Sequence, residues 1–209
     1  TLQGYVDTLI DGAVADPDVN MKYLQRSSFT IERMITMVED LETITKLEQN
    51  TDPLHITKFD FITLVKEVID IMELKANTRN IQMIIQNHTS APLYVLADKE
   101  KIRQVLINLI DNSIKYGRQS GKTFIKIYYF EQNLLIEIED NGIGIDEGHL
   151  QRIFERFYRV DKSRSREVGG TGLGLAIVKH IIEAHDQHIN VRSKVGVGTT
   201  FTFTLPLAN

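Results

Sequence analysis

The apolar residues of this chain follow two patterns, and the change falls near Pro53. Between Met21 and Glu48 they recur at three- and four-residue steps, the period of an amphipathic helix. Asp16-Pro17 offers an N-cap and a proline at the first helical position, so we expect one helix of about 30 residues, roughly 45 Å long. After Pro53, short apolar runs alternate with helical ones, which predicts a domain of mixed strands and helices.

The predicted helical part covers residues 1–52, and it cannot bury its own apolar surface. The long helix carries two neighbouring apolar seams, which favours contacts with more than one neighbour, as in a four-helix bundle. The other helix expected here is short, Leu2 to Ile10. Two helices make half a bundle, so we expect a homodimer through residues 1–50. The alternative, in which the long helix lies on the chain's other domain, remains open.

The second part, residues 53–209, is predicted to be an α+β domain. Phe124–Phe130 and Leu134–Glu139 are typical of a hairpin around a turn at Gln132-Asn133. The aspartates before two helical patterns are expected N-caps. Because strands come in hairpins with helices between them, we expect a two-layer sandwich with helices on one face of the sheet. The remaining expected elements are helices Asp60–Lys75, Asp98–Tyr116, Glu147–Ile153 and Leu173–Ala184 and strands Leu54–Lys58, Ile81–Gln86, Leu93–Leu96, Asn190–Lys194 and Thr200–Pro206.

Charge and composition exclude several classes of function. The formal charge is −4 and no block is rich in Lys or Arg, so neither nucleic acid nor an anionic membrane is an expected partner. The chain has no cysteine, which excludes disulfides, thiolate catalysis and Cys-ligated zinc and fits the cytoplasm. No apolar run approaches the roughly 20 residues of a membrane span.

A glycine-rich stretch, Gly169-Gly170-Thr171-Gly172-Leu173-Gly174, leads directly into an amphipathic helix. This arrangement favours binding of a phosphate, because glycines permit close approach and the unpaired amides at a helix start face an anion. It matches neither the dinucleotide-binding pattern nor the P-loop. One helix dipole is worth about 0.3–1 kcal/mol, whereas micromolar binding requires about 8, so other residues must contribute.

The helix that ends at Tyr116 places Asn108, Asp111, Asn112 and Lys115 on one face. Two asparagines at i and i+4 are unfavourable inside a helix, which favours a role such as contact with Mg²⁺ through amide oxygens. Taken by itself, the pattern is better explained by a solvated polar face, because charged helix faces are common.

A second polar motif follows a predicted strand: Asp140-Asn141-Gly142-Ile143-Gly144. Asp-Asn-Gly is a common turn signal, and a plain turn is one interpretation. The other is that Asp140 accepts a hydrogen bond from an adenine amino group while the glycines make room for the ring.

Five motifs occur together and in order: Asn108-x-x-x-Asn112-x-x-Lys115-Tyr116, Asp140-x-Gly142-x-Gly144, Phe154-Glu155-Arg156-Phe157-Tyr158-Arg159, Gly170-x-Gly172-x-Gly174 and Gly196-x-Gly198-Thr199. In order and spacing they resemble the N, first glycine, F, second glycine and third glycine boxes of bacterial sensor histidine kinases. The resemblance implies the two-layer nucleotide-binding fold of the histidine kinases, gyrases and chaperone ATPases. It also implies that residues 1–52 belong to a dimerisation hairpin.

The resemblance further implies a site for ATP and Mg²⁺. Asn112 would ligate Mg²⁺ on the ATP phosphates, with Asn108 beside it at the reacting end and Lys115 near the phosphates, and Asn108 and Lys115 would be the catalytic residues. Tyr116 would pack on the nucleotide, and Asp140 would hold the adenine amino group. The other residues implied in nucleotide binding are Gly142, Gly144, Ile145, Phe157, Arg159, Lys162, Gly170, Thr171, Gly172, Leu173, Gly174 and Thr199. The segment Arg159–Gly169 resembles the ATP lid.

The chain departs from the family pattern in one respect. The family's phosphoacceptor is a histidine followed by an acidic residue and then a Thr-Pro pair, and none of the six histidines here has that context. We therefore expect the acceptor upstream of Thr1, in a parent protein that is anchored in the membrane and phosphorylates the receiver domain of a response regulator. The chain itself should bind ATP without autophosphorylating. The alternative function is an ATP-gated conformational ATPase like the chaperones, gyrases and mismatch-repair proteins, which carry an acidic residue where Asn108 stands.

Overall fold

The computed structural model describes residues 2–49, 53–87, 91–160 and 170–208. The chain divides into two compact units, Thr1–Thr43 and Ile44–Asn209. This division precedes the predicted domain boundary after residue 52, because the last turn of the long helix packs within the second unit. Ile44 is fully buried there, and Glu48 forms an ion pair with Arg156. The assignment of residues 1–52 and 53–209 as functional domains stays a prediction.

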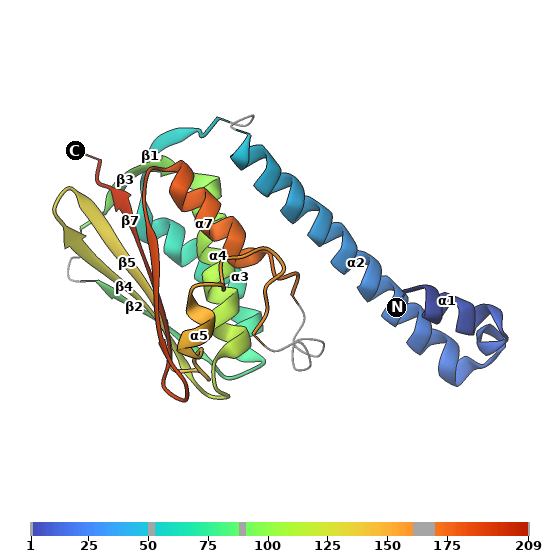
Figure 1. Ribbon diagram of the computed structural model, residues 1–209. Helices are drawn as coiled ribbons and strands as arrows, with labels where there is room; N and C mark the ends of the chain where they lie inside the picture. Colours follow the sequence, from blue (N-terminus) through green and yellow to red (C-terminus); the bar gives the residue numbers. More distant parts are fainter. Residues whose placement is uncertain (1, 50–52, 88–90, 161–169, 209) are drawn as a thin grey trace. The chain divides into compact units, whose positions relative to one another are not determined.

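The first unit contains α1 (Leu2–Ile10), a 3₁₀ turn η1 (Ala13–Ala15) and most of α2 (Pro17–Glu48) (Figure 1). Asp16 starts α2 as predicted, since its Oδ1 accepts a hydrogen bond from the N–H of Asp18 at 2.9 Å. The rings of Tyr5 in α1 and Tyr23 in α2 lie 6.0 Å apart, so the two helices contact each other. None of the described helices combines the length and apolarity needed to cross a bilayer.

The apolar stripe of α2 is largely open to solvent. Ile35 and Val38 are 53% and 64% exposed, and Ile31 and Met34 are similarly exposed. A contiguous apolar stripe on a helix marks a surface that contacts another protein surface. The exposure is therefore compatible with the predicted dimer, which stays a prediction.

The second unit is built on a mixed five-stranded sheet of order β2-β4-β5-β7-β6, with α3, α4 and α7 on one face (Figure 1). β2 and β4 are parallel, whereas the other neighbours are antiparallel. A separate two-stranded sheet pairs β1 with β3. The elements are β1 (Ile56–Asp60), α3 (Phe61–Asn77), β2 (Gln82–Asn87), β3 (Tyr94–Asp98), α4 (Lys99–Tyr116), β4 (Lys122–Phe130), β5 (Asn133–Asp140), α5 (Glu147–Leu150), α7 (Gly174–Ala184), β6 (Ile189–Lys194) and β7 (Gly198–Pro206).

Alternating burial along the strands explains why the helices cover one face only. In β5, Leu134, Ile136 and Ile138 are buried, and the residues between them are partly exposed. β4 and β7 alternate in the same way, which places one apolar face under the helices. The predicted α+β two-layer fold is thus confirmed.

Two local predictions need correction. The β4–β5 turn is formed by Glu131 and Gln132, one residue earlier than predicted, because Asn133 pairs with Phe130 and Glu131 adopts a φ of 54°. Strands β1 and β3 lie later than predicted and end at Asp60 and Asp98. An N-cap residue has extended backbone angles, so each aspartate ends a strand and caps the next helix.

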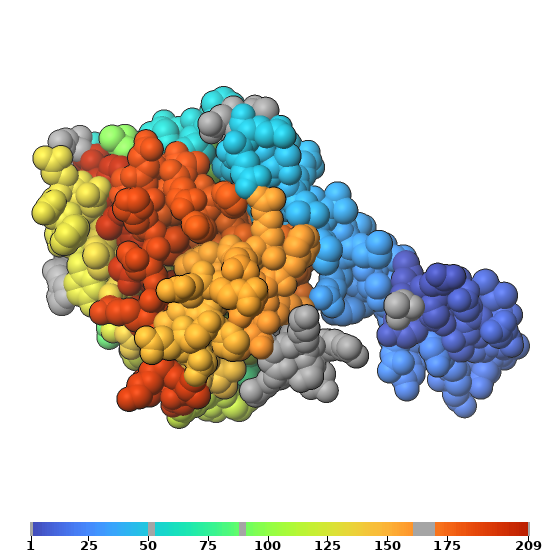
Figure 2. Space-filling model, viewed as in Figure 1, coloured from blue at the N-terminus to red at the C-terminus, as the bar shows by residue number. Residues whose placement is uncertain are grey.

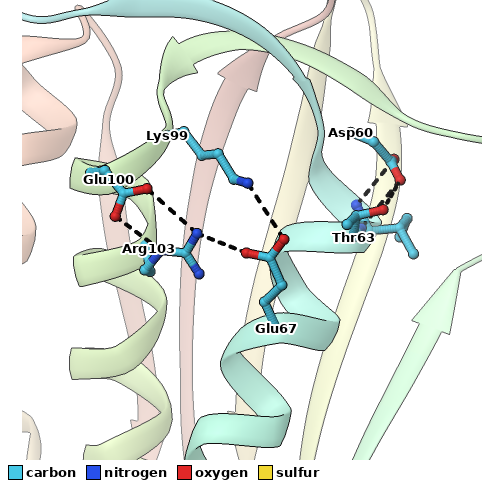
Figure 3. Close-up of polar contacts among 7 residues, drawn as sticks. Asp60, Thr63, Glu67, Lys99, Glu100 and Arg103 are labelled. Carbon is cyan, nitrogen blue, oxygen red and sulfur yellow. Dashed lines mark hydrogen bonds and ion pairs between the residues drawn. The ribbon is translucent and has the colours of Figure 1, made fainter.

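Partly exposed ion pairs join α3 to the first turns of α4 (Figure 3). Arg103 lies 2.7 Å from Glu67 and 3.1 Å from Glu100, and Lys99 lies 3.4 Å from Glu67. The hydrogen bond from Arg103 is the main reason why the pKa of Glu67 is lowered. Asp60 begins α3 beside this group by accepting the N–H of Thr63 at 3.2 Å.

We predict that Ile35→Glu with Val38→Glu converts a dimer into monomers, because charges on both positions oppose burial of the stripe. Sedimentation velocity measures this. Phe29→Glu is the matched control: Phe29 is 60% exposed and lies nine residues, or 2.5 helical turns, from Val38, on the opposite face of α2. An intact dimer in the double variant would refute the prediction.

Candidate functional site

Helix α4 presents the polar residues that the sequence singled out. Its apolar side, including Val105, Leu106 and Leu109, is fully buried. This packing fixes the rotation of the helix, so the opposite face carries Asn108 and Asn112 one turn apart, each partly buried.

The start of α7 lies against this face. Gly170 and Gly172 have φ values of 112° and 78°, which only glycine adopts without strain. A Cβ on Gly174, the first residue of α7, would lie 3.5 Å from Oδ1 of Asn108. Nδ2 of Asn108 is buried and has no hydrogen-bond partner among the described residues. An unpaired buried donor costs about 1–3 kcal/mol, so this amide is poised to donate to a ligand oxygen.

Lys115 reaches the same place from the last turn of α4. Its Nζ lies 2.6 Å from Oδ2 of Asp111, and a Cβ on Gly170 would lie 3.7 Å from that Nζ. A cation and an unpaired amide donor therefore flank the glycine-rich start of α7. This end of the site has the chemistry to bind an anion.

Asp140 marks the other end of the site. It is the last residue of β5 and is only 8% exposed, and its Oδ1 accepts the N–H of Gly142 at 2.8 Å. Burial raises the pKa of Asp140, while backbone hydrogen bonds from Gly142 and Thr199 oppose the rise. A buried carboxylate is unfavourable for stability, so its presence favours a function.

The loop after Asp140 is tied to α4. The N–H of Ile143 donates to the carbonyl of Tyr116 at 3.1 Å, and a Cβ on Gly142 would lie 2.3 Å from that oxygen. Only glycine therefore fits between the loop and the end of the helix.

The same loop is tied to the β6–β7 hairpin. A Cβ on Gly144 would lie 2.1 Å from the carbonyl of Lys194. The N–H of Ile145 donates to Oγ of Ser193 at 2.8 Å, and Ser193 is in turn 2.8 Å from Oγ1 of Thr199. Ser193 was not expected from the sequence, because it lies in an ordinary hairpin pattern.

Phe157 and Arg159 hold the glycine loop through its backbone. The N–H of Phe157 donates to the carbonyl of Gly172 at 3.0 Å, and Arg159 donates to the carbonyl of Gly170 at 2.8 Å. Phe157 has a φ of 62°, which is strained for a bulky residue. In Figure 2, residues 147–160 are coloured orange, and the hydrogen bond from Phe157 joins this segment to Gly172, just before α7.

The structure thus gathers the predicted residues into two groups joined by α4. Asn112 lies on the polar face of α4, one turn from Asn108. Lys162 lies outside the described residues. The first group is Asn108, Lys115, Phe157, Arg159, Gly170, Thr171, Gly172, Leu173 and Gly174, and the second is Tyr116, Asp140, Gly142, Gly144, Ile145 and Thr199.

The described residues contain no cluster of three or more His, Asp or Glu that could hold a metal by itself. Mg²⁺ requires only one or two protein oxygens when phosphates complete its ligand set. The amide oxygens on α4 therefore fit Mg²⁺ only together with a bound phosphate ligand.

Arg79 is a residue that sequence reasoning missed. It lies just after α3, and its guanidinium donates to the carbonyls of Ile114, Lys115 and Gly117, the last at 3.0 Å. It thereby satisfies carbonyls that the end of α4 leaves unpaired. No pattern near Arg79 signals this contact, which joins residues 35 to 38 positions apart.

Comparison with known proteins identifies the class. Residues 97–209 match the family described as histidine kinase-, DNA gyrase B-, and HSP90-like ATPase, and the chain belongs to this family. Within it, the chain contains a catalytic domain of the bacterial sensor histidine kinase type.

The relatives agree with this assignment. The chain is 38% identical to the sensor histidine kinase WalK of Bacillus subtilis (strain 168) over 99% of its own length and 34% of that protein. It thus spans about a third of this curated relative. The Acinetobacter baumannii histidine kinase AdeS matches all of this chain and 94% of its own, with 32% identity and a TM-score of 0.79. Histidine kinase ThkA, solved in complex with response regulator protein TrrA, matches 99% of this chain and 57% of its own, with 25% identity and a TM-score of 0.79.

We predict that Arg79→Met lowers the free energy of unfolding by about 1–3 kcal/mol and weakens nucleotide binding, because the carbonyls at the end of α4 lose a charged donor. Urea unfolding and calorimetry with ADP measure the two effects. Arg192→Met, on a 76% exposed side chain paired with Glu137, is the control and should change neither. Unchanged stability in Arg79→Met would contradict this role.

Proposed function

We propose that this chain binds ATP with Mg²⁺ and supplies the γ-phosphoryl group to a histidine outside these 209 residues. The observation that carries the proposal is the buried, unpaired Nδ2 of Asn108 beside the first residue of α7. A donor in this position matches an anion held at a helix start. The buried carboxylate of Asp140 at the far end matches the amino group of adenine.

Each residue has a role that follows from its position. Asp140 accepts a hydrogen bond from the adenine amino group, and Tyr116, 41% exposed beside that loop, packs on the nucleotide. Asn108 and Lys115 bind phosphate oxygens at the start of α7, where the helix dipole also attracts an anion. Asn112 would hold Mg²⁺, which would reduce the negative charge of the phosphates. Phosphoryl transfer depends mainly on such positioning and electrostatics.

We infer that the parent protein is a two-component sensor kinase that works as a homodimer, with this domain in the cytoplasm. The name of the WalK relative supports a sensor kinase, and ThkA is described in complex with a response regulator. The phosphoryl group would pass from histidine to an aspartate of a response regulator. The conformational ATPase alternative is disfavoured because Asn108 replaces the acidic residue which that mechanism needs.

We predict that wild type binds ADP in the presence of Mg²⁺ and that Asp140→Asn weakens this binding by about ten- to a hundredfold. This range corresponds to the roughly 1.5–3 kcal/mol of a hydrogen bond to a charged group. Isothermal titration calorimetry measures it. Glu139→Gln is the control, because Glu139 is the neighbouring acid on the other face of β5, where it pairs with Lys126.

The melting temperature of Asp140→Asn shows whether weaker ADP binding comes from a lost contact or from an unfolded protein. The pKa of Asp140 is raised in the folded state, so its ionised form opposes folding above the unfolded pKa. At pH 7 the neutral amide removes this cost, and Asp140→Asn should melt at or above the wild-type temperature. No ADP binding by wild type, or equal binding by Asp140→Asn, would refute the site.

We also predict that the chain incorporates no acid-labile, alkali-stable phosphate from γ-labelled ATP. Residues 1–52 contain no histidine, and His185 is buried with both ring nitrogens hydrogen-bonded. Fusing a helix with a family-type acceptor histidine before Thr1 should restore labelling, and replacing that histidine by Gln is the matched control. Labelling of the unmodified chain would contradict the assignment of the acceptor.

A further inference from the structure

Lys75 lies in α3, outside every motif that the sequence singled out. Its ammonium group pairs with Oδ1 of Asp111 in α4. The other oxygen of the same carboxylate, Oδ2, lies 2.6 Å from Nζ of Lys115. One carboxylate therefore holds two lysines, one from each helix. Asp111 and Lys115 are 19% and 21% exposed, so solvent screens this pair only in part.

These three residues, which we call the lysine–aspartate triad, lie at the phosphate end of the proposed site. Nζ of Lys115 faces Gly170, where a Cβ would be 3.7 Å away. The triad carries a net charge of +1, from two lysines and one aspartate. Without Lys75 the remaining pair would be neutral.

We propose that Lys75, acting through Asp111, determines how much positive charge Lys115 offers to the nucleotide phosphates. Lys75 is a positioning residue and does not itself touch the nucleotide. This inference rests on the proposed function, since it assigns a further residue to the same site.

The physical reason is competition for Lys115. When phosphates bind, Lys115 must share its ammonium group between them and Asp111. With Lys75 on Oδ1, the carboxylate keeps a partner and its charge stays compensated. Without Lys75, turning Lys115 to the phosphates would leave a partly buried carboxylate unpaired next to a polyanion, which is unfavourable. Asp111 would then retain Lys115.

The triad therefore affects charged ligands selectively. Adenosine has no phosphate, so its binding depends on the end of the site formed by Asp140 and Tyr116. ADP places its phosphates at the triad. A change in Lys75 that acts through charge alters ADP binding and leaves adenosine binding unchanged, whereas a change that only disturbs the fold weakens both.

The experiment measures the dissociation constants of ADP, with Mg²⁺, and of adenosine by NMR titration of backbone amides. Lys75→Met should weaken ADP binding about three- to tenfold, the size expected for one charge several ångströms away in a partly screened site. Adenosine binding should change less than about twofold. Asp111→Asn in the Lys75→Met background should bring ADP affinity back toward wild type, because the carboxylate that retained Lys115 is gone. Lys75→Arg keeps the charge and should bind ADP like wild type.

Lys99→Met is the matched control. Lys99 is also a partly exposed lysine in an ion pair between α3 and α4, but its partner is Glu67 and it lies at the far end of α4 from Lys115 (Figure 3). It should leave both affinities unchanged.

Unchanged ADP binding in Lys75→Met, an equal loss of adenosine and ADP binding, or no recovery in the double variant would each overturn the role of Lys75. In those cases wild type still binds ADP, so the proposed function stands. If wild type bound no ADP, the proposed function and this inference would fail together.

Discussion

The site depends on how α4 is rotated against the sheet. Its apolar side is fully buried, so the helix has one stable orientation, and the polar face must look toward α7 and the loop after β5. Asn108 then meets Gly174, and Tyr116 meets Gly142. A small rotation of α4 would displace both ends of the site at once, because this one helix carries residues of both ends, Asn108 and Tyr116.

The two ends of α4 are held by residues that take no part in the proposed chemistry. Asp98 caps the first turn through the N–H groups of Glu100 and Lys101, and its own N–H donates to Nε2 of His185 just after α7. Arg79 closes the last turn. The start of α4 is therefore linked to the end of α7. This link helps to hold Asn108 of α4 against Gly174 at the start of α7.

The sequence predicted the elements of this fold well, because periodicity and caps are local. Asp60 and Asp98 were recognised as caps, and the first residues of α3 and α4 followed from them. The parallel pairing of β2 with β4 was not predicted, since it depends on contacts between segments about 40 residues apart rather than on any turn.

The site residues that were predicted are those whose type is energetically unfavourable, or specially required, at their position in a helix or loop. Two asparagines inside a helix and glycines at positive φ are visible in the sequence for that reason. Arg79, Ser193 and Lys75 were missed because nothing is unusual about an arginine, a serine or a lysine on the surface of a domain. Their roles arise from partners that only folding brings near.

The residues of the site lie where regular elements end. Asp140 ends β5, Tyr116 ends α4 and Gly174 begins α7. Backbone groups at such ends lack partners within their own element, so they are available to a ligand or to neighbouring loops. The neighbouring loops use some of them: Phe157 and Arg159 occupy the carbonyls of Gly172 and Gly170. With these carbonyls occupied, the N–H groups in the first turn of α7, which have no partner within the helix, are the backbone groups left to meet an anion. The positive φ of Phe157 belongs to the contact that holds the glycine loop in this form.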